Sequence, residues 1–171
     1  MTLIELADEE ARLRSELCRC TGNIEQKVLR LRECGVFEAY ERIHAEYAKL
    51  ANEGDDEALK RALFLQWYTY ADASFSSGLS ELDEANENSI IAILNSRAEA
   101  NELDAELCWM LPWYFNICDW YFESTLKKSP LMSWLRQHRS EEFPAKQVSK
   151  VSLSGRGQMS EYWYRPDHSE S

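Results

Sequence analysis

The sequence predicts an all-α, single-domain helical bundle of about six or seven helices with an irregular C-terminal tail. The chain has only six Gly and four Pro in 171 residues, too few for the many turns of an all-β fold. Apolar residues recur at helical spacing through most of residues 1–139, and the hydrophobic fraction of 44% is ample for one buried core. Stacked helical hairpins are an alternative arrangement of the same helices.

The first two helices are predicted from their caps. Thr2 and Glu5 form a Thr-x-x-Glu capping box, which satisfies two backbone donors at a helix start. That helix should extend to about residue 20, where a Thr-Gly pair interrupts it. Asn23 can cap a second helix that reaches about Glu33, and Gly35 ends it.

Two longer helices should follow. The helix predicted over 36–52 has an apolar stripe that includes His44. Asp55 caps the next helix, in which 58–71 is apolar nearly all round. Such a helix is typically buried, so we expect this one in the interior.

The second half of the chain should contain three helices. We expect a loop over 72–80 and then an amphipathic helix over 83–100 with one acidic, exposed side. The segment 104–122 is the predicted central helix, because apolar and aromatic residues cover both of its sides, with a kink at Pro112. A last helix over 129–138 begins with a Ser-Pro pair.

The chain changes character after about residue 139, so we divide it into a helical domain, 1–139, and a tail or arm, 140–171. A weak alternation of residue types over 149–154 allows one short strand. The aromatic triplet Tyr162 to Tyr164 is costly to expose to water, and we expect it to dock on the body or on a partner.

The net charge of −11 is unevenly distributed. Between Glu81 and Glu123 there are ten acidic residues and one base, Arg97, so this stretch carries a charge of −9. Such a field repels phosphate groups, which argues against direct binding of nucleic acid, and it attracts basic proteins or cations.

Five cysteines in segments predicted to be helical do not resemble a secreted disulfide scaffold. The N-terminal residues are acidic where a signal peptide needs a basic and then an apolar region. Since no run approaches the roughly 18 apolar residues of a membrane span, we expect a cytoplasmic protein without a membrane partner.

Sequence motifs of known chemistry do not support a catalytic residue, a cofactor or a metal site. The chain has neither a phosphate-binding Gly-rich loop nor a nucleophile elbow. Cys18 and Cys20 would point roughly 200° apart on a helix, and His44 belongs to a single Glu-x-x-His motif where di-iron bundles need two.

Polar residues on the two helices expected to be buried are the candidates for hidden chemistry. Gln66, Asn116 and Asp119 each need a hydrogen-bond partner, since burial without one costs on the order of 1–3 kcal/mol. An internal hydrogen-bond network is one interpretation, and a Trp-lined pocket for an amine or cation around Asp119 is a second. Catalysis by Asp119 as a base of raised pKa is a third, for which the sequence shows no second catalytic group. The ligand-binding candidates are Asp119, Asn116, Gln66, Trp113, Trp120, Trp67, Tyr70 and His44.

The leading functional hypothesis is a small interaction protein of bacterial type, acting through its acidic surface on a basic partner protein as inhibitor or immunity proteins do. The alternative hypothesis is a small-molecule-binding protein or an enzyme that uses the Trp-lined core. A third hypothesis is a homodimer, in which a second copy of the chain covers one apolar face. The partner-binding candidates are Glu81, Asp83, Glu84, Glu87, Tyr162, Trp163 and Tyr164.

Overall fold

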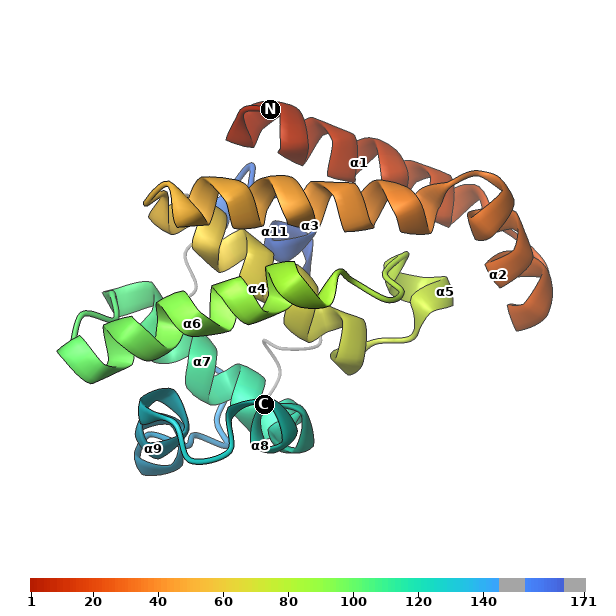
Figure 1. Ribbon diagram of the computed structural model, residues 1–171. Coiled ribbons are helices and arrows are strands. Elements are labelled where there is room, and N and C mark those ends of the chain that lie inside the picture. The colour runs from red at the N-terminus through yellow and green to blue at the C-terminus, as the bar shows by residue number, and fades with distance from the viewer. Residues whose placement is uncertain (145–152, 165–171) are drawn as a thin grey trace.

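The computed structural model describes residues 1–144 and 153–164, and its regular secondary structure in these ranges is entirely helical (Figure 1). The predicted all-α class is therefore confirmed, with ten helices in the described residues rather than six or seven. In chain order the helices are α1 (Leu3–Arg19), α2 (Ile24–Glu33), α3 (Val36–Asn52), α4 (Asp56–Ala71), α5 (Ser74–Ser77), α6 (Glu84–Ala100), α7 (Ala105–Ile117), α8 (Asp119–Leu126), α9 (Pro130–Gln137) and α11 (Gln158–Trp163).

The predicted helix starts are confirmed by side-chain caps. At α1 the Glu5 N–H donates to Thr2 Oγ1 while the Thr2 N–H donates to the Glu5 carboxylate, which completes the capping box. Five more helices are capped by the side chain expected from the sequence: Asn23, Asp55, Asp83, Asp104 and Ser129. Local sequence chemistry therefore decides where these helices begin.

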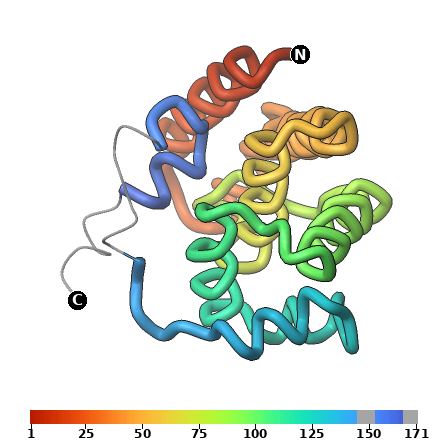
Figure 2. The backbone as a smooth tube through the Cα atoms, turned by 90° about the vertical axis from the view of Figure 1, so that its left-hand side faces the viewer, coloured from red at the N-terminus to blue at the C-terminus, as the bar shows by residue number. Residues whose placement is uncertain are grey.

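Helix α4 occupies the centre of the molecule. Every residue from Ala58 to Tyr68 is buried, as its all-round apolar sequence predicts. Helix α3 packs along it, and α6, α7 and α11 contact it from other sides. Figure 1 shows α1 and α3 lying side by side over α4, and Figure 2 shows the same layers from the side.

The prediction of one central helix over 104–122 is wrong, because this segment forms two helices. Helix α7 continues through Pro112 and ends at Ile117, and Cys118 leaves the helical region with φ −130° and ψ 54°. Helix α8 then starts in a new direction that buries Tyr121 and Phe122. The predicted loop over 72–80 also contains a short helix, α5.

The last described segment, 153–164, folds back on the body. Helix α11 packs against α1 and α4, far from it in sequence (Figure 2). Tyr162 and Trp163 are buried, and Tyr164 is half-buried. The strand predicted over 149–154 falls mostly on residues outside the described ranges.

Candidate functional site: an acidic and aromatic surface

Two buried polar residues, His44 of α3 and Gln66 of α4, lie together. Gln66 is fully buried, and its side-chain amide donates to the Tyr121 hydroxyl at 2.6 Å and to the backbone carbonyl of Glu87 at 3.4 Å. The fully buried His44 ring lies beside Gln66, and neither ring nitrogen reaches a hydrogen-bond partner in the described part of the chain. Burial lowers the pKa of His44 to about 4, so this imidazole is neutral near pH 7.

Glu87 lies where this cluster meets the surface. The Tyr70 hydroxyl donates to the Glu87 carboxylate at 3.5 Å, a long and weak hydrogen bond. The pKa of Glu87 is raised to about 7, chiefly by partial burial and also by the negative charges of Glu84 and Asp83, while the hydrogen bond from Tyr70 opposes the shift. Glu87 is therefore a carboxyl group without a strong partner.

An exposed aromatic pair adjoins Glu87. Tyr70 on α4 and Trp120 on α8 meet edge to face, with ring centroids 5.7 Å apart, and are 39% and 55% exposed. Tyr121 stacks under Tyr70 at 4.4 Å and holds the ring in place from the buried side. Aromatic side chains exposed at the surface next to acidic groups offer a cation both ring surface and negative charge.

The other acids of this region are exposed at the start of α6. Asp83 caps the helix through the Asn86 N–H, and Glu81 and Glu84 lie close enough to act on Tyr70 and Glu87 respectively. None of these acids has an ion-pair partner among residues 1–144 and 153–164. We call this set the acidic–aromatic surface, and it consists of Tyr70, Glu81, Asp83, Glu84, Glu87 and Trp120.

The expectation that Asp119 is buried is wrong. The helix break at Cys118 places Asp119 in the first turn of α8, where its side chain is 45% exposed and lies 3.7 Å from Arg139. Asn116 is half-buried, and Trp120 points to the surface rather than into the core. Two surface hollows of about 470 and 320 Å³ lie elsewhere, along 22–27 and between α1 and the last segment.

The remaining aromatic candidates form the interior. Trp67 is fully buried and donates from Nε1 to the Tyr114 carbonyl at 3.1 Å. Trp113 donates to the Tyr162 hydroxyl at 2.7 Å, so the last segment is part of the same aromatic core. Tyr162 and Trp163, candidates for partner contact, are therefore covered by the body of their own chain.

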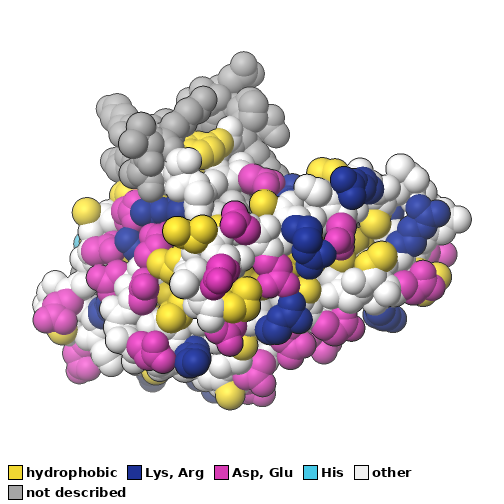
Figure 3. Space-filling model, turned by 90° about the horizontal axis from the view of Figure 1, so that it is seen from above, with side chains coloured by type: hydrophobic (Ala, Val, Ile, Leu, Met, Phe, Trp, Pro, Cys, Tyr) yellow, Lys and Arg dark blue, Asp and Glu magenta, His cyan; other side chains and the backbone are white. Residues whose placement is uncertain are grey.

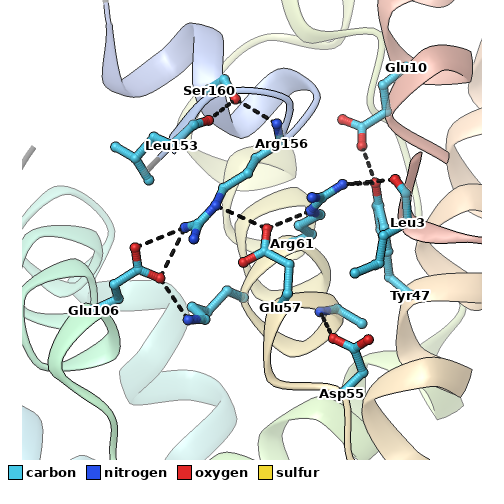
Figure 4. Close-up of polar contacts among 12 residues, drawn as sticks. Leu3, Glu10, Tyr47, Asp55, Glu57, Arg61, Glu106, Leu153, Arg156 and Ser160 are labelled. Atoms are coloured by element: carbon cyan, nitrogen blue, oxygen red, sulfur yellow. Dashed lines mark hydrogen bonds and ion pairs between the residues drawn. The ribbon is translucent and has the colours of Figure 1, made fainter. Parts of the chain in front are cut away.

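A second polar cluster was missed by the sequence analysis (Figure 4). Arg156 pairs with Glu106 through Nη1 at 3.0 Å and with Glu57 through Nε at 3.1 Å, while Lys60 also reaches Glu106 at 2.6 Å. The buried Glu10 accepts from the Tyr47 hydroxyl at 2.7 Å. Arg156 and Lys60 neutralise Glu57 and Glu106 and connect the last segment to α4 and α7, and the Gln158 N–H connects it to Glu10 of α1.

The sequence does contain one signal for this cluster. Glu10 falls on the same helical face as Leu6, Leu13 and Leu17, all of which are buried. An acid within an apolar stripe indicates a buried carboxyl group, whereas its partners in the last segment could not be identified from spacing alone.

Charges elsewhere are mixed or paired. Over α1 and α3, acidic and basic side chains are interspersed (Figure 3), and Arg42 and Arg12 pair there with acids of α1. Within the described ranges, no group of three His, Cys, Asp or Glu side chains is placed to bind a metal, and no helix is long and apolar enough to cross a membrane. Comparisons with protein-family models, curated proteins and solved structures found no match.

Proposed function

We propose that the protein is an interaction module that docks a basic segment of a partner protein on the acidic–aromatic surface. The supporting observation is an exposed aromatic pair, Tyr70 and Trp120, of which Tyr70 contacts Glu87, one of four neighbouring acids that have no ion-pair partner among the described residues. Masking a basic surface in this way is how an inhibitor or immunity protein acts.

The acids of this surface differ from most others in the acidic half of the chain. Asp104 and Glu106 pair with Lys60, Glu123 with Arg136, and Asp119 with Arg139. The charges of these acids are therefore balanced by bases of the same chain. Glu81, Asp83 and Glu84 instead are exposed and have no ion-pair partner among the described residues, so they are available to an external cation.

The geometry favours an arginine-bearing or lysine-bearing segment over an enclosed small molecule. A cation over an exposed aromatic face gains roughly 0.5–1 kcal/mol, and each exposed carboxylate adds an amount of similar size. Small-molecule sites are typically concave and bury most of the ligand. Tyr70 and Trp120 instead protrude, and neither described hollow includes them.

A reducing, cytoplasmic location is part of the same proposal. All five cysteines are free thiols, three of them exposed. Exposed free thiols are typical of proteins in a reducing compartment. The homodimer remains an alternative use of the same exposed aromatic pair and would be detected by gel filtration.

The test uses an arginine-rich peptide with blocked ends and two double variants of equal charge change. Glu81→Gln/Glu84→Gln removes two charges from the surface, and Glu99→Gln/Glu102→Gln removes two exposed charges from the other end of α6. We expect the first to weaken peptide binding about five- to tenfold and the second to change it less than about twofold.

Trp120→Ala should weaken binding by a similar factor, and binding should weaken as salt rises because the charges are exposed. Equal effects of the two double variants would indicate attraction by net charge without a site. No measurable binding to the wild-type protein would contradict the proposed function.

A further inference from the structure

A chain of polar side chains runs beneath the acidic–aromatic surface and ends at Glu87. Gln66 connects the Tyr121 hydroxyl with the Glu87 backbone carbonyl, and His44 lies buried beside Gln66 with both ring nitrogens unpartnered in the described residues. These groups are uncharged near pH 7. The described part of the interior therefore supplies Glu87 with dipoles and no cation.

Among residues 1–144 and 153–164, the groups that face Glu87 from neighbouring elements include no base. Tyr70 of α4 donates a long hydrogen bond, and Tyr121 of α8 lies near enough to sense the carboxylate charge. Burial raises the pKa of both phenols, so they stay protonated below pH 9.

On its own element Glu87 faces acids alone. Asp83 and Glu84 raise its pKa, and Glu81 acts on Tyr70 from the segment before α6. His44 of α3 is neutral, since its pKa lies near 4. Half-burial among acids and neutral groups favours the protonated form of Glu87, and an arriving cation favours the carboxylate.

We propose that docking of a basic segment on the acidic–aromatic surface releases a proton from Glu87 to solvent, so that the surface binds more tightly as pH rises from 6 to 8. This inference rests on the proposed function. The Glu87 O–H bond breaks, the proton goes to water, and the carboxylate pairs with the cation of the partner. Glu87 thereby makes recognition of the basic segment sensitive to pH.

The size of the effect follows from linkage. A free-state pKa of about 7 leaves Glu87 mostly protonated at pH 6 and mostly ionised at pH 8. If the bound form is fully ionised, affinity rises about tenfold over this interval, and about half a proton is released per binding event at pH 7.

The test measures the dissociation constant of an all-arginine peptide with acetylated and amidated ends at pH 6 and 8, at equal ionic strength. This peptide has no group that titrates in the interval. Glu87→Gln is compared with Glu84→Gln, which removes the same charge from the same helix turn. Calorimetry in buffers of different ionisation enthalpy counts the released protons.

We expect the wild type to bind about tenfold more tightly at pH 8, Glu84→Gln to bind more weakly while keeping most of that ratio, and Glu87→Gln to show a ratio near one. Binding of the wild type that is independent of pH, or an unchanged ratio in Glu87→Gln, would overturn the role of Glu87 and leave the docking proposal intact. Absence of binding at both pH values would overturn the two together.

Discussion

The Glu10 carboxylate accepts a hydrogen bond from the backbone N–H of Gln158 at 2.8 Å, across 148 residues of sequence. The Gln158 side chain donates in turn to the Ser77 carbonyl at 2.7 Å. These contacts bring α1, α5 and the start of α11 together around one buried acid. The last segment is therefore held by specific polar contacts as well as by its aromatic residues.

Gly157→Ala should detach or destabilise this segment. Gly157 has φ +58°, and a Cβ at this position would collide with the Glu10 carboxyl group. We expect the free energy of unfolding to fall by about 2–4 kcal/mol, measured by urea denaturation. Gly155→Ala is the matched control, because Gly155 also has a positive φ but open space around it, and it should cost only about 1 kcal/mol. Equal losses would show that the contact with Glu10 is unimportant.

The contribution of Glu10 to the free energy of unfolding should rise as pH falls from 8 to 5. Burial raises the pKa of Glu10 from 4.5 to about 7, so the folded state binds a proton that the unfolded state has lost in this interval. Its contribution is full below about pH 4.5 and is lost as pH rises through 7. This amounts to roughly 2–3 kcal/mol between pH 5 and 8.

Glu10→Gln should remove most of that dependence, in urea denaturation at the two pH values. Glu87 contributes with the same sign as Glu10, because its pKa is also raised. His44 contributes with the opposite sign over the same interval, because burial lowers its pKa from 6.5 to about 4, so the variant should be compared with the wild type at each pH. Asp104 and Glu106 act in the opposite direction at lower pH, because ion pairs lower their pKa despite the opposing effect of burial. A pH dependence unchanged in Glu10→Gln would contradict the buried state of this acid.

Arg156→Ala should destabilise the protein by about 2–3 kcal/mol. The guanidinium is 14% exposed and binds both oxygens of Glu106 as well as Glu57, so its loss leaves two partly buried acids under-compensated. Arg156→Lys should recover part of the loss, because lysine cannot reproduce the two-sided geometry. Arg136→Ala, which breaks an exposed pair at 3.5 Å, should cost less than about 0.5 kcal/mol. If both alanine variants lost the same amount of stability, the partly buried Arg156 pairs would be no more important than the exposed Arg136 pair.

Lys127→Gly should raise stability by about 1 kcal/mol. Lys127 connects α8 to α9 with φ +47° and ψ −115°, a conformation that side chains other than glycine rarely adopt. Relief of this strain exceeds the entropy that glycine adds to the unfolded chain. Lys127→Ala keeps the strain, so its thermal midpoint should stay within 1–2 °C of the wild type, in contrast to the glycine variant.

The helix starts could be predicted from the sequence because they depend on local contacts. Caps such as Thr2, Asp55 and Asp104 satisfy backbone donors within their own first turn, so the sequence alone identifies them. The end of α7 at Ile117 lacks a Gly or Pro signal. It arises from tertiary packing, since α8 must turn to bring Tyr121 to Gln66.

The same helix break explains the errors at the candidate site. A continuous helix would have buried Asp119 and Trp120, whereas the turn at Cys118 brings both to the surface. Tyr70 and Glu87 were assigned to two different candidate sites, and only the fold shows that they are in contact. Glu10 was detectable as an acid in an apolar stripe, but its contact with Gln158 depends on the return of the last segment.

Hydrogen–deuterium exchange with and without the blocked arginine peptide tests the central claim most directly, because it locates the contact on the intact chain. Docking on the acidic–aromatic surface predicts slower exchange in the segments that carry Tyr70, Glu81 to Glu87 and Trp120, and unchanged exchange over α2. Protection elsewhere, or an unchanged pattern under conditions where the peptide binds, would contradict the proposed docking surface.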